Sequence, residues 1–395
     1  RRLKRSDGQR MKPLKTNHHL ASIPPAILTK YLDLTTNPEV ISLSVGEPDF
    51  ATPYHIREAA IEAISQGKTF YTPSKGFLSL RKEISSVMER KYDLNYDPVT
   101  EVLVTIGASE AIEVALITLL NEGDEVIVVS PSYISYEPII TMFGGKIVNI
   151  ETLESEGFRL TPVALKEKLS DKTRLVILNY PNNPSGAIMN REDLEAIADV
   201  LRDTDVHILS DEIYSELTYQ GAHVSLASLQ GMREKTLVIN GFSKAYAMTG
   251  WRLGYVCAPK EIIDALTKYH QYAVLCAPTI SQFAGIEALK NGDEDIVHMR
   301  EQYDMRRRFV VKRLNDMGLS TANPLGAFYV FVNVKSTGMG SVEFCDALLD
   351  SKKVALIPGT AFGISGEGYV RLSYSYSIHH RSEEHTSELQ SLSHL

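Results

Sequence analysis

A lysine and an arginine eight positions apart are the residues of this sequence best suited to chemistry. Lys244 lies among small residues in the stretch GFSKAYAMTGWRLG, directly after the apolar run 236–240. Burial in a tight turn lowers the pKa of a lysine and frees its lone pair, so that it can form a Schiff base. Arg252 is flanked by glycines, and an arginine in that setting suits a phosphate. The pair suggests an aldehyde cofactor that carries a phosphate; a surface lysine and a structural arginine are the alternative.

The triplet Gly107, Ala108 and Ser109 is a candidate anion site. It follows the apolar run 102–106 and opens a helix-like pattern that continues to Leu120. The first turn of a helix has free N–H groups, and the helix dipole favours negative charge there. A tight turn between a strand and a helix, with no ligand, is the alternative.

Asp211 and Tyr214 lie in the stretch SDEIY, at the end of another apolar run. A carboxylate at that place can pair with a protonated ring nitrogen, which makes the ring a better electron sink. The tyrosine hydroxyl can donate to a phenolate oxygen of the same ring. The two residues are equally consistent with a helix-capping aspartate and a packed tyrosine.

Three further residues could contact a ligand. Asn183, in a turn that reads NPSG, projects an amide, and Tyr133 could stack on a flat ring; a plain turn and core packing are the alternatives. Arg371 is a lone charge in the apolar run 368–373 and therefore requires a partner. A carboxylate bound in bidentate fashion is the natural partner, and an internal ion pair is the alternative.

Strands and helices that alternate along the chain must position these residues. Strands are predicted at 40–45, 102–106, 125–129, 146–150, 174–178, 206–209, 237–240 and 253–257, and helices at 56–64, 78–92, 107–120, 135–143, 163–169 and 192–201. Strands rich in Val, Ile and Leu that are separated by helices indicate an α/β fold, a three-layer sandwich with a mainly parallel central sheet. Ligands of such sheets bind beyond the carboxyl ends of the strands, where Gly107, Asn183, Asp211 and Lys244 are expected.

After residue 261 the pattern changes, and we predict a second, smaller α+β domain. Helices are predicted at 262–272, 280–290, 295–317 and 342–349, and strands at 328–334, 354–357 and 369–374. The predicted organisation is a non-native or disordered leader at 1–12, an N-terminal arm at 13–47 that joins the small domain, a large domain at 48–285, a small domain at 286–380 and an adapter-derived tail at 381–395. An ordinary disordered polar end is the alternative for the tail.

Size and composition are typical of a globular, cytoplasmic protein. The 395 residues suffice for two domains, and 44% are hydrophobic and 23% charged. No apolar run approaches the ~20 residues that span a bilayer, and no secretory signal is recognisable. The three cysteines fit a reducing compartment and lack metal-ligand spacing, so we predict no metal site. The net charge of −8 argues against nucleic acid as a partner.

Taken together, these motifs resemble the class I and II aminotransferases, the fold type I family that uses pyridoxal 5'-phosphate. The resemblance covers nearly all of 11–378, and the lysine motif matches the family's attachment signature at every constrained position. Also matching are Gly46, Tyr71 in YTPSKG, the NPSG turn, the DEIY motif, and Arg371 with its trailing LSY. The nearest likeness is to the bacterial subgroup that comprises aminotransferase A and the aromatic and N-acetyl-LL-diaminopimelate aminotransferases.

The resemblance implies a role for each of these residues. Lys244 would hold the cofactor through a Schiff base and then move a proton between the substrate and the cofactor. The other implied contacts are Asp211 at the ring nitrogen, Tyr214 and Asn183 at the ring oxygen, Tyr133 on the ring face, Arg252, Gly107, Ala108 and Ser109 at the phosphate, and Gly46, Asn183 and Arg371 at the substrate α-carboxylate. Tyr71 would reach the phosphate of a neighbouring subunit, which implies a homodimer with shared active sites.

Three features depart from some relatives. Gly241 stands where those relatives have a hydroxyl residue as a phosphate ligand, a role that Ser243 could take. Ser109 stands where some aspartate-selective relatives have a lysine, which puts strict aspartate specificity in doubt. After residue 378 the family usually continues into another helix, whereas this chain has a polar tail, so we predict lower stability or poorer closure of the small domain.

The predicted reaction is a ping-pong transamination between an L-amino acid and a 2-oxo acid, within amino-acid biosynthesis. The resemblance leaves the amino acid open among aromatic, N-acetyl-diaminopimelate-like and broad specificities. The alternatives are a carbon–sulfur β-lyase with the same cofactor and, from a different class, a non-catalytic regulator on the same scaffold. We expect no nucleic-acid or membrane partner, and we expect the arm at 23–31 to form part of the pocket for the substrate side chain.

Overall fold

The computed structural model describes residues 17–25, 30, 37 and 39–376. The predicted leader at 1–12 and the predicted tail at 381–395 lie outside these residues, as does most of the arm before residue 39. Within the described part, α1 (His18–Ser22) is the first helix. No helix of the described ranges is long and apolar enough to cross a membrane.

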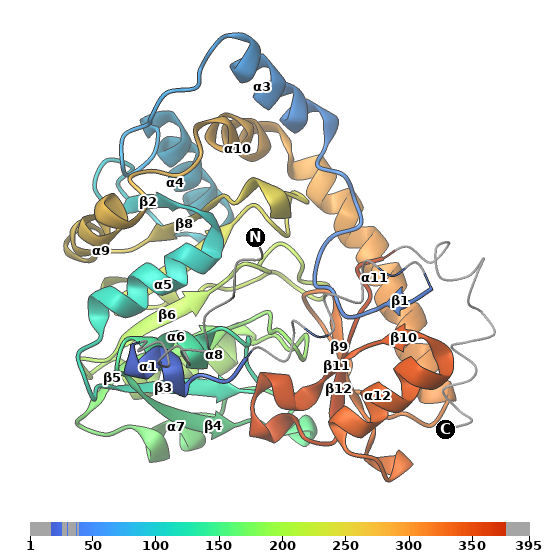
Figure 1. The fold of residues 1–395 in the computed structure, drawn as a ribbon. Coiled ribbons are helices and arrows are strands. Elements are labelled where there is room, and N and C mark those ends of the chain that lie inside the picture. Colours follow the sequence, from blue (N-terminus) through green and yellow to red (C-terminus); the bar gives the residue numbers. More distant parts are fainter. Residues whose placement is uncertain (1–16, 26–29, 31–36, 38, 377–395) are drawn as a thin grey trace, which may run out of the picture.

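A seven-stranded sheet forms the centre of the molecule (Figure 1). Its order is β2 (Val102–Thr105), β8 (Gly254–Cys257), β7 (Thr236–Gly241), β6 (His207–Asp211), β5 (Thr173–Asn179), β3 (Glu125–Ser130) and β4 (Lys146–Glu151). Only β8 runs against its neighbours, because it pairs antiparallel with both β2 and β7. The predicted α/β fold with a mainly parallel sheet is therefore confirmed.

Successive side chains of each strand point to opposite faces of the sheet, so the core has one layer on each face. Val126 and Val128 of β3 pack into one core cluster, and Ile127 and Val129 pack into another on the opposite face. Helices α5 (Gly107–Leu119), α6 (Tyr136–Met142) and α9 (Lys260–Ala273) cover the first face, whereas α3 (Tyr54–Ser65), α4 (Leu78–Tyr92), α7 (Pro162–Lys168), α8 (Arg191–Leu201) and α10 (Thr279–Asn291) cover the second. The period of two in the strands thus produces the predicted three-layer sandwich.

The C-terminal part of the chain forms a smaller α+β unit. The long helix α11 (Asp293–Asp316) leads from the region of α10 towards it (Figure 1). Its sheet has the order β11 (Ile357–Pro358), β12 (Tyr369–Ser373) and β9 (Tyr329–Asn333), all antiparallel, beside α12 (Ser341–Lys352). The predicted boundary between residues 285 and 286 falls inside α10, so the division into domains stays a prediction.

Two predicted strands, one in this unit and one in the N-terminal arm, are wrong in detail. The strand predicted at 354–357 is two strands, because β10 (Val354–Ala355) pairs in parallel with β1 (Ile41–Ser42), whereas β11 pairs with β12. The strand predicted at 40–45 is reduced to β1, which needs β10 as its only partner in the two-stranded sheet. This pairing attaches β1, at the described end of the predicted arm, to the C-terminal unit.

Candidate active site

A cavity of about 250 Å³ lies at the carboxyl ends of the parallel strands. It is lined by Gly46, Ala108, Ser109, Ile112, Tyr133, Asn179, Asn183, Asp211, Ile213, Tyr214, Ser243, Lys244, Thr249, Arg252, Tyr329 and Arg371. All residues that the sequence singled out are among them, except Gly107 and Tyr71. Five others that line the cavity were missed: Ile112, Asn179, Ile213, Thr249 and Tyr329.

Lys244 lies in the turn that follows β7, and its side chain is partly buried. Its Nζ donates to the backbone carbonyl oxygen of Gly46 over 2.6 Å. Loss of hydration lowers the pKa of Lys244 to about 8, and the positive charge of Arg371 contributes in the same direction. A larger share of the neutral amine is therefore present near neutral pH than for an ordinary lysine. Such an amine can act as a nucleophile or a base.

Asp211 ends β6, and its buried carboxylate is held from two sides. Oδ2 accepts a hydrogen bond of 2.6 Å from the hydroxyl of Tyr136, and Oδ1 accepts one of 3.2 Å from the backbone N–H of Ile213. Burial raises the pKa of Asp211 to about 6, and the neighbouring Glu212 adds to this effect. A buried carboxylate of this kind is stabilised by a cationic partner, such as a protonated ring nitrogen.

Arg371 lies on β12 and is 5% exposed. Nη1 donates to Oδ1 of Asn183 over 2.9 Å, and Nη2 donates to the carbonyl oxygen of Ser44 over 2.6 Å. Nε is buried without a hydrogen-bond partner, and the hydrogen-bond acceptors of this guanidinium among the described residues are an amide and a carbonyl oxygen, with no carboxylate. The alternative of an internal ion pair is therefore not seen within the described chain. A buried guanidinium with a free donor fits an incoming carboxylate.

Tyr329 connects the residues around Arg371. Its ring lies 4.4 Å from the Cζ atom of Arg371, and its hydroxyl lies 2.7 Å from that of Tyr214. A Cβ atom on Gly46 would come within 1.9 Å of the same Tyr329 hydroxyl, so only glycine fits at position 46. Tyr329 therefore fixes one wall of the cavity.

Arg252 and the start of α5 form a positively charged end of the cavity. Arg252 is exposed, has a φ of 52°, and donates through Nη2 to Oγ of Ser109 over 3.4 Å. Gly107 has a φ of 72°, and a Cβ atom there would lie 2.7 Å from Nη2 of Arg252. Close approach of the guanidinium to the helix start thus requires glycine at position 107. A cation beside a helix N-terminus is a suitable phosphate site.

Ser243 was expected to replace the phosphate-binding hydroxyl that some relatives have at the position of Gly241. Ser243 is buried in the cavity wall. Gly241 ends β7, and a Cβ atom there would lie 3.0 Å from the carbonyl oxygen of Leu253. A side chain at position 241 would therefore crowd β8, whereas Ser243 faces the cavity.

Tyr71 is not brought to this cavity. Its side chain is 83% exposed in a loop that the side chain of Gln282 holds through bonds to Phe77 and Thr72. Of the arm at 23–31, the described residues Ile23–Pro25 and Lys30 do not line the cavity, and the others lie outside the described residues. The contact of Tyr71 was expected with a neighbouring subunit and stays a prediction, as does the role of the arm.

The described side chains fit a phosphorylated pyridine aldehyde. An amine of lowered pKa, a buried carboxylate and an anion site lie in one cavity, and the Nε of Arg371 remains free for a second anion. The edge-to-face contact between Tyr133 and Tyr136, with centroids 5.4 Å apart, leaves the ring of Tyr133 on the cavity wall.

Comparison with known proteins agrees with this geometry. Residues 38–381 match the family model described as aminotransferase class I and II. The chain is 48% identical over 352 residues to a protein of Bacillus subtilis (strain 168) named probable N-acetyl-LL-diaminopimelate aminotransferase, covering 89% of each chain. It is 43% identical over 357 residues to the aspartate aminotransferase of Pyrococcus abyssi, covering 89% of this chain and 92% of that one.

The fold is also similar to solved structures. The crystal structure of the aromatic aminotransferase from Pyrococcus horikoshii OT3 superposes with a TM-score of 0.84 at 44% identity, covering 89% of this chain and 94% of that one. The structural neighbours are aminotransferases of fold type I, a family that generally depends on pyridoxal phosphate. The chain therefore belongs to the class I and II aminotransferases and is an enzyme that transfers amino groups.

Proposed function

We propose that this enzyme exchanges an amino group between an L-amino acid and a 2-oxo acid, with pyridoxal 5'-phosphate held in the 250 Å³ cavity. The observation that carries the proposal is that Lys244 shares one cavity with two anion sites. The charges of Arg371 and Arg252, one at each anion site, both lower the pKa of Lys244. One anion site suits the carboxylate of the substrate, and the other suits the phosphate of the cofactor.

The cofactor would be held by residues of several strand ends. When bound, it supplies an aldehyde that condenses with amines and a ring that accepts the electron pair released at the substrate α-carbon. Asp211 would hold a proton on the ring nitrogen through its carboxylate. Arg252 and the backbone N–H groups at Gly107, Ala108 and Ser109 would bind the phosphate, with Ser243 as a further donor.

The ring oxygen would be bound by Tyr214 and Asn183. Because Oδ1 of Asn183 accepts from Arg371, its Nδ2 remains available as a donor. The hydroxyl of Tyr214 is oriented by that of Tyr329. Tyr133 would cover the ring face from the cavity wall.

Lys244 would move the proton that the reaction requires. Its lowered pKa allows Nζ to take a proton from the substrate α-carbon and to return one to the carbon that receives the amino group. Arg371 would fix the α-carboxylate through its unpartnered Nε and orient the α-carbon towards Nζ. The backbone of Gly46, which now accepts from Nζ, completes this side of the cavity.

The specificity for the amino donor and for the 2-oxo acid acceptor is best described as broad. At position 109, where some aspartate-selective relatives have a lysine, the cavity wall carries a serine. This difference argues against strict selection of aspartate. Ile112 and Tyr133 add apolar surface that an aromatic or long aliphatic side chain could contact. The related proteins named above carry three different substrate names, so a panel of amino acids is required.

The test follows the absorbance of the bound cofactor while single amino acids are added. Conversion to the amine form, reversed by a 2-oxo acid, supports transamination. Release of pyruvate and ammonia from an amino acid with a β-sulfur substituent, with no oxo acid required, would instead support the carbon–sulfur β-lyase. Absence of any spectral change with a full panel of amino acids would contradict both.

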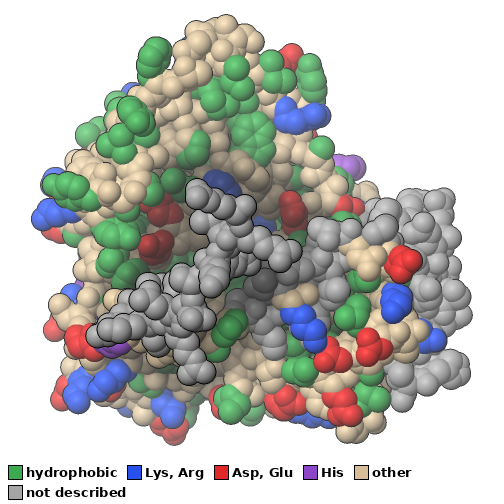
Figure 2. Space-filling view, in the orientation of Figure 1, with side chains coloured by type: hydrophobic (Ala, Val, Ile, Leu, Met, Phe, Trp, Pro, Cys, Tyr) green, Lys and Arg blue, Asp and Glu red, His purple; other side chains and the backbone are tan. Residues whose placement is uncertain are grey.

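We also propose a homodimer with shared active sites. Phe70 and Tyr71 are 80% and 83% exposed, and Tyr54, Ile61 and Ile64 of α3 are more than half exposed. Figure 2 shows hydrophobic side chains gathered over the part of the surface that includes α3. Large exposed apolar side chains close together are typical of an interface, and Tyr71 on such a face could reach a partner's phosphate site. Analytical ultracentrifugation that finds a monomer at micromolar concentration would contradict this proposal.

A further inference from the structure

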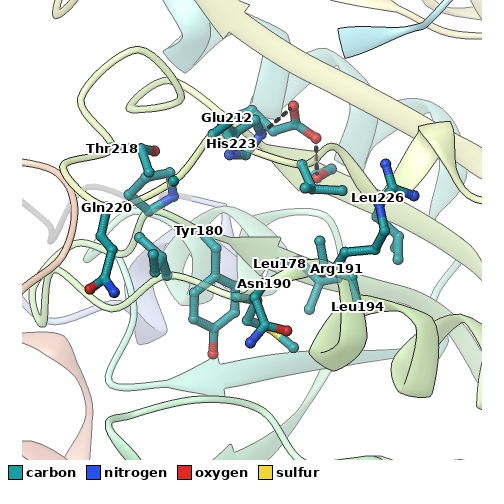
Figure 3. A pocket seen from close by; sticks show the side chains of 17 residues that line it. Leu178, Tyr180, Asn190, Arg191, Leu194, Glu212, Thr218, Gln220, His223 and Leu226 are labelled. Carbon is teal, nitrogen blue, oxygen red and sulfur yellow. Dashed lines mark hydrogen bonds and ion pairs between the residues drawn. The ribbon is translucent and has the colours of Figure 1, made fainter.

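Two consecutive residues at the end of β6 point into different cavities. Asp211 lines the active-site cavity, whereas Glu212 lines a second cavity of about 120 Å³ on the face of the sheet covered by α8 (Figure 3). Glu212 is 2% exposed, and the exposed residues Arg191 and Gln220 also line this second cavity. The active-site chemistry assigned above uses Asp211 and leaves Glu212 without a role.

Glu212 has a complete set of hydrogen-bond partners. Oε1 accepts from the hydroxyls of Ser210 and Ser225 over 2.8 and 2.7 Å, and Oε2 lies 2.9 Å from Nε2 of His223. Figure 3 shows the imidazole directed at the carboxylate. The His223 side chain is 9% exposed and its ring packs edge-to-face on Tyr92. Within the described chain, His223 is the ion-pair partner of Glu212, and a carboxylate at this depth requires such a partner.

The backbone of Glu212 also organises the turn that carries the active-site residues. Its N–H donates to the carbonyl oxygen of Ile239 on β7 over 2.8 Å, and its carbonyl accepts from Ser215 over 2.9 Å. Asp211 and Tyr214 lie within the same turn. The side chain of Glu212, held at three points, therefore fixes the segment between the two residues that would contact the cofactor ring.

The groups around both carboxylates are few. Asp211 is hydrogen-bonded by the Tyr136 hydroxyl and the Ile213 N–H, and it interacts at longer range with Glu212, Lys244 and the Tyr214 phenol. Glu212 interacts with His223 and, at longer range, with Tyr96, Tyr255 and Cys257. Burial raises the pKa of these two phenols and of the Cys257 thiol well above their usual ranges, so they stay neutral. Glu212 and Lys244 are therefore the described charged groups with a resolved effect on Asp211.

We propose that Glu212 and His223 form a positioning pair behind the sheet, which holds the Asp211 turn and sets the charge that the Asp211 carboxylate experiences. The proposal rests on the proposed contact of Asp211 with the cofactor ring. The negative charge of Glu212 opposes ionisation of Asp211. His223, paired with Oε2 of Glu212, would offset that effect in its protonated form. The two members of the pair thus act on Asp211 in opposite directions.

Two substitutions that keep hydrogen-bonding capacity test the pair. Glu212→Gln removes the negative charge, and His223→Gln removes the imidazole that pairs with this charge while keeping a donor towards Glu212. The affinity of the cofactor-free protein for pyridoxal 5'-phosphate is measured from pH 4.5 to 8 by absorbance titration. The titration of the ligand itself is common to all variants and cancels when they are compared.

The expected shifts have opposite signs. Glu212→Gln should move the acidic fall in affinity to lower pH by about half a unit or more, because Asp211 then ionises more readily. His223→Gln should move it to higher pH, because the unpaired Glu212 charge opposes that ionisation. His55→Gln is the matched control: His55 is paired with Glu287 and Asp295, lines neither cavity, and should leave the fall in place.

A merely structural role would give a different result. Shifts of both variants in the same direction, or no shift in either, would overturn the proposal even if melting temperatures fall. Asp211→Asn is measured in parallel to separate this inference from the proposed function. If that variant keeps the acidic fall, the proposed contact of Asp211 with the cofactor fails. If it loses the fall while the two pair variants behave like the wild type, only the positioning pair fails.

Discussion

Two arginines line the active-site cavity, and they differ in burial and in the number of groups that hold them. Arg371 is 5% exposed, and Asn183, Ser44 and the ring of Tyr329 hold it on three sides. Arg252 is exposed, and its hydrogen bonds within the described residues are those to Ser109 and, over 3.1 Å, to the carbonyl oxygen of Thr249. The first arginine is positioned by the chain alone, whereas the second is poised for a ligand.

The physical reason is burial. A guanidinium that is removed from water must replace its bonds to water with hydrogen bonds to the protein. The substrate end of the cavity, around Arg371, is therefore organised before any ligand binds. A guanidinium in contact with water has no such requirement. The phosphate end therefore combines an exposed cation, a left-handed backbone at Arg252 and glycine at 107, all of which allow an anion to approach closely.

Removing the amine between the two ends should have the largest effect. Lys244→Ala takes away the group that would bind the cofactor and move the proton, so we expect turnover to fall at least about a thousandfold. Initial rates and the absorbance of the bound cofactor measure this loss. Lys91→Ala is the control, because Lys91 is also partly buried but is paired with Glu216 and Asp293 away from the cavity. An active Lys244→Ala enzyme would refute the assignment.

Changing the buried arginine should affect the substrate and spare the cofactor. In Arg371→Lys the bidentate geometry is lost and a carbonyl acceptor is left unsatisfied, so kcat/KM should fall by roughly a hundredfold or more. The affinity for pyridoxal 5'-phosphate should stay within about threefold, because the phosphate end is untouched. Steady-state kinetics with one amino acid and its oxo acid, together with cofactor titration, distinguish the two. A large loss of cofactor affinity would break the separation of the ends.

Changing the exposed arginine should do the reverse, with a smaller effect. In Arg252→Gln the affinity for pyridoxal 5'-phosphate should fall by roughly tenfold to a hundredfold, because one charged contact with the phosphate is lost. At saturating cofactor the KM for the amino acid should be unchanged. In the double variant Arg252→Gln/Arg371→Lys the two losses should add, since the two arginines share no hydrogen-bond partner. Strong non-additivity would show that the ends are coupled.

The smallest effect concerns the contribution of Asp211 to the free energy of unfolding. The pKa of Asp211 is raised to about 6, so between about pH 4 and 6 the folded protein holds a proton that the unfolded chain has lost. Stability is therefore lost as pH rises through 6, and the ionised carboxylate remains unfavourable above it. In the cofactor-free protein, Asp211→Asn should raise the free energy of unfolding at pH 7.5 by up to about 3 kcal/mol and give no gain at pH 4. Urea unfolding at both pH values checks this, and equal changes at the two would contradict it.

Local sequence was sufficient for the residues that follow apolar strands. Asp211, Lys244 and the start of α5 end or follow buried strands of a parallel sheet, and that topology brings strand ends together whatever the rest of the chain does. The central sheet and its helices were predictable for the same reason, because Val and Ile runs alternate with helical periods. Asn179 could have been found in this way too, as a polar residue at the end of β5.

The tertiary structure decided the contacts between elements far apart in the sequence. Nothing near Tyr329 indicates that its hydroxyl meets Tyr214 and closes the space over Gly46, and nothing near Tyr136 indicates that it donates to Asp211. The division of 354–357 into two strands likewise depends on a partner more than 300 residues away at Ile41.

What the sequence by itself determined is therefore the chemistry: an amine and a carboxylate that follow or end buried strands, and two guanidinium groups. Their types and local spacing are carried by short motifs. What only the tertiary structure decided is how each charge is balanced: Arg371 enclosed and Arg252 open, Asp211 facing the active site and Glu212 facing His223. Burial and charge pairing depend on every element that packs around a group, and no short motif carries that information.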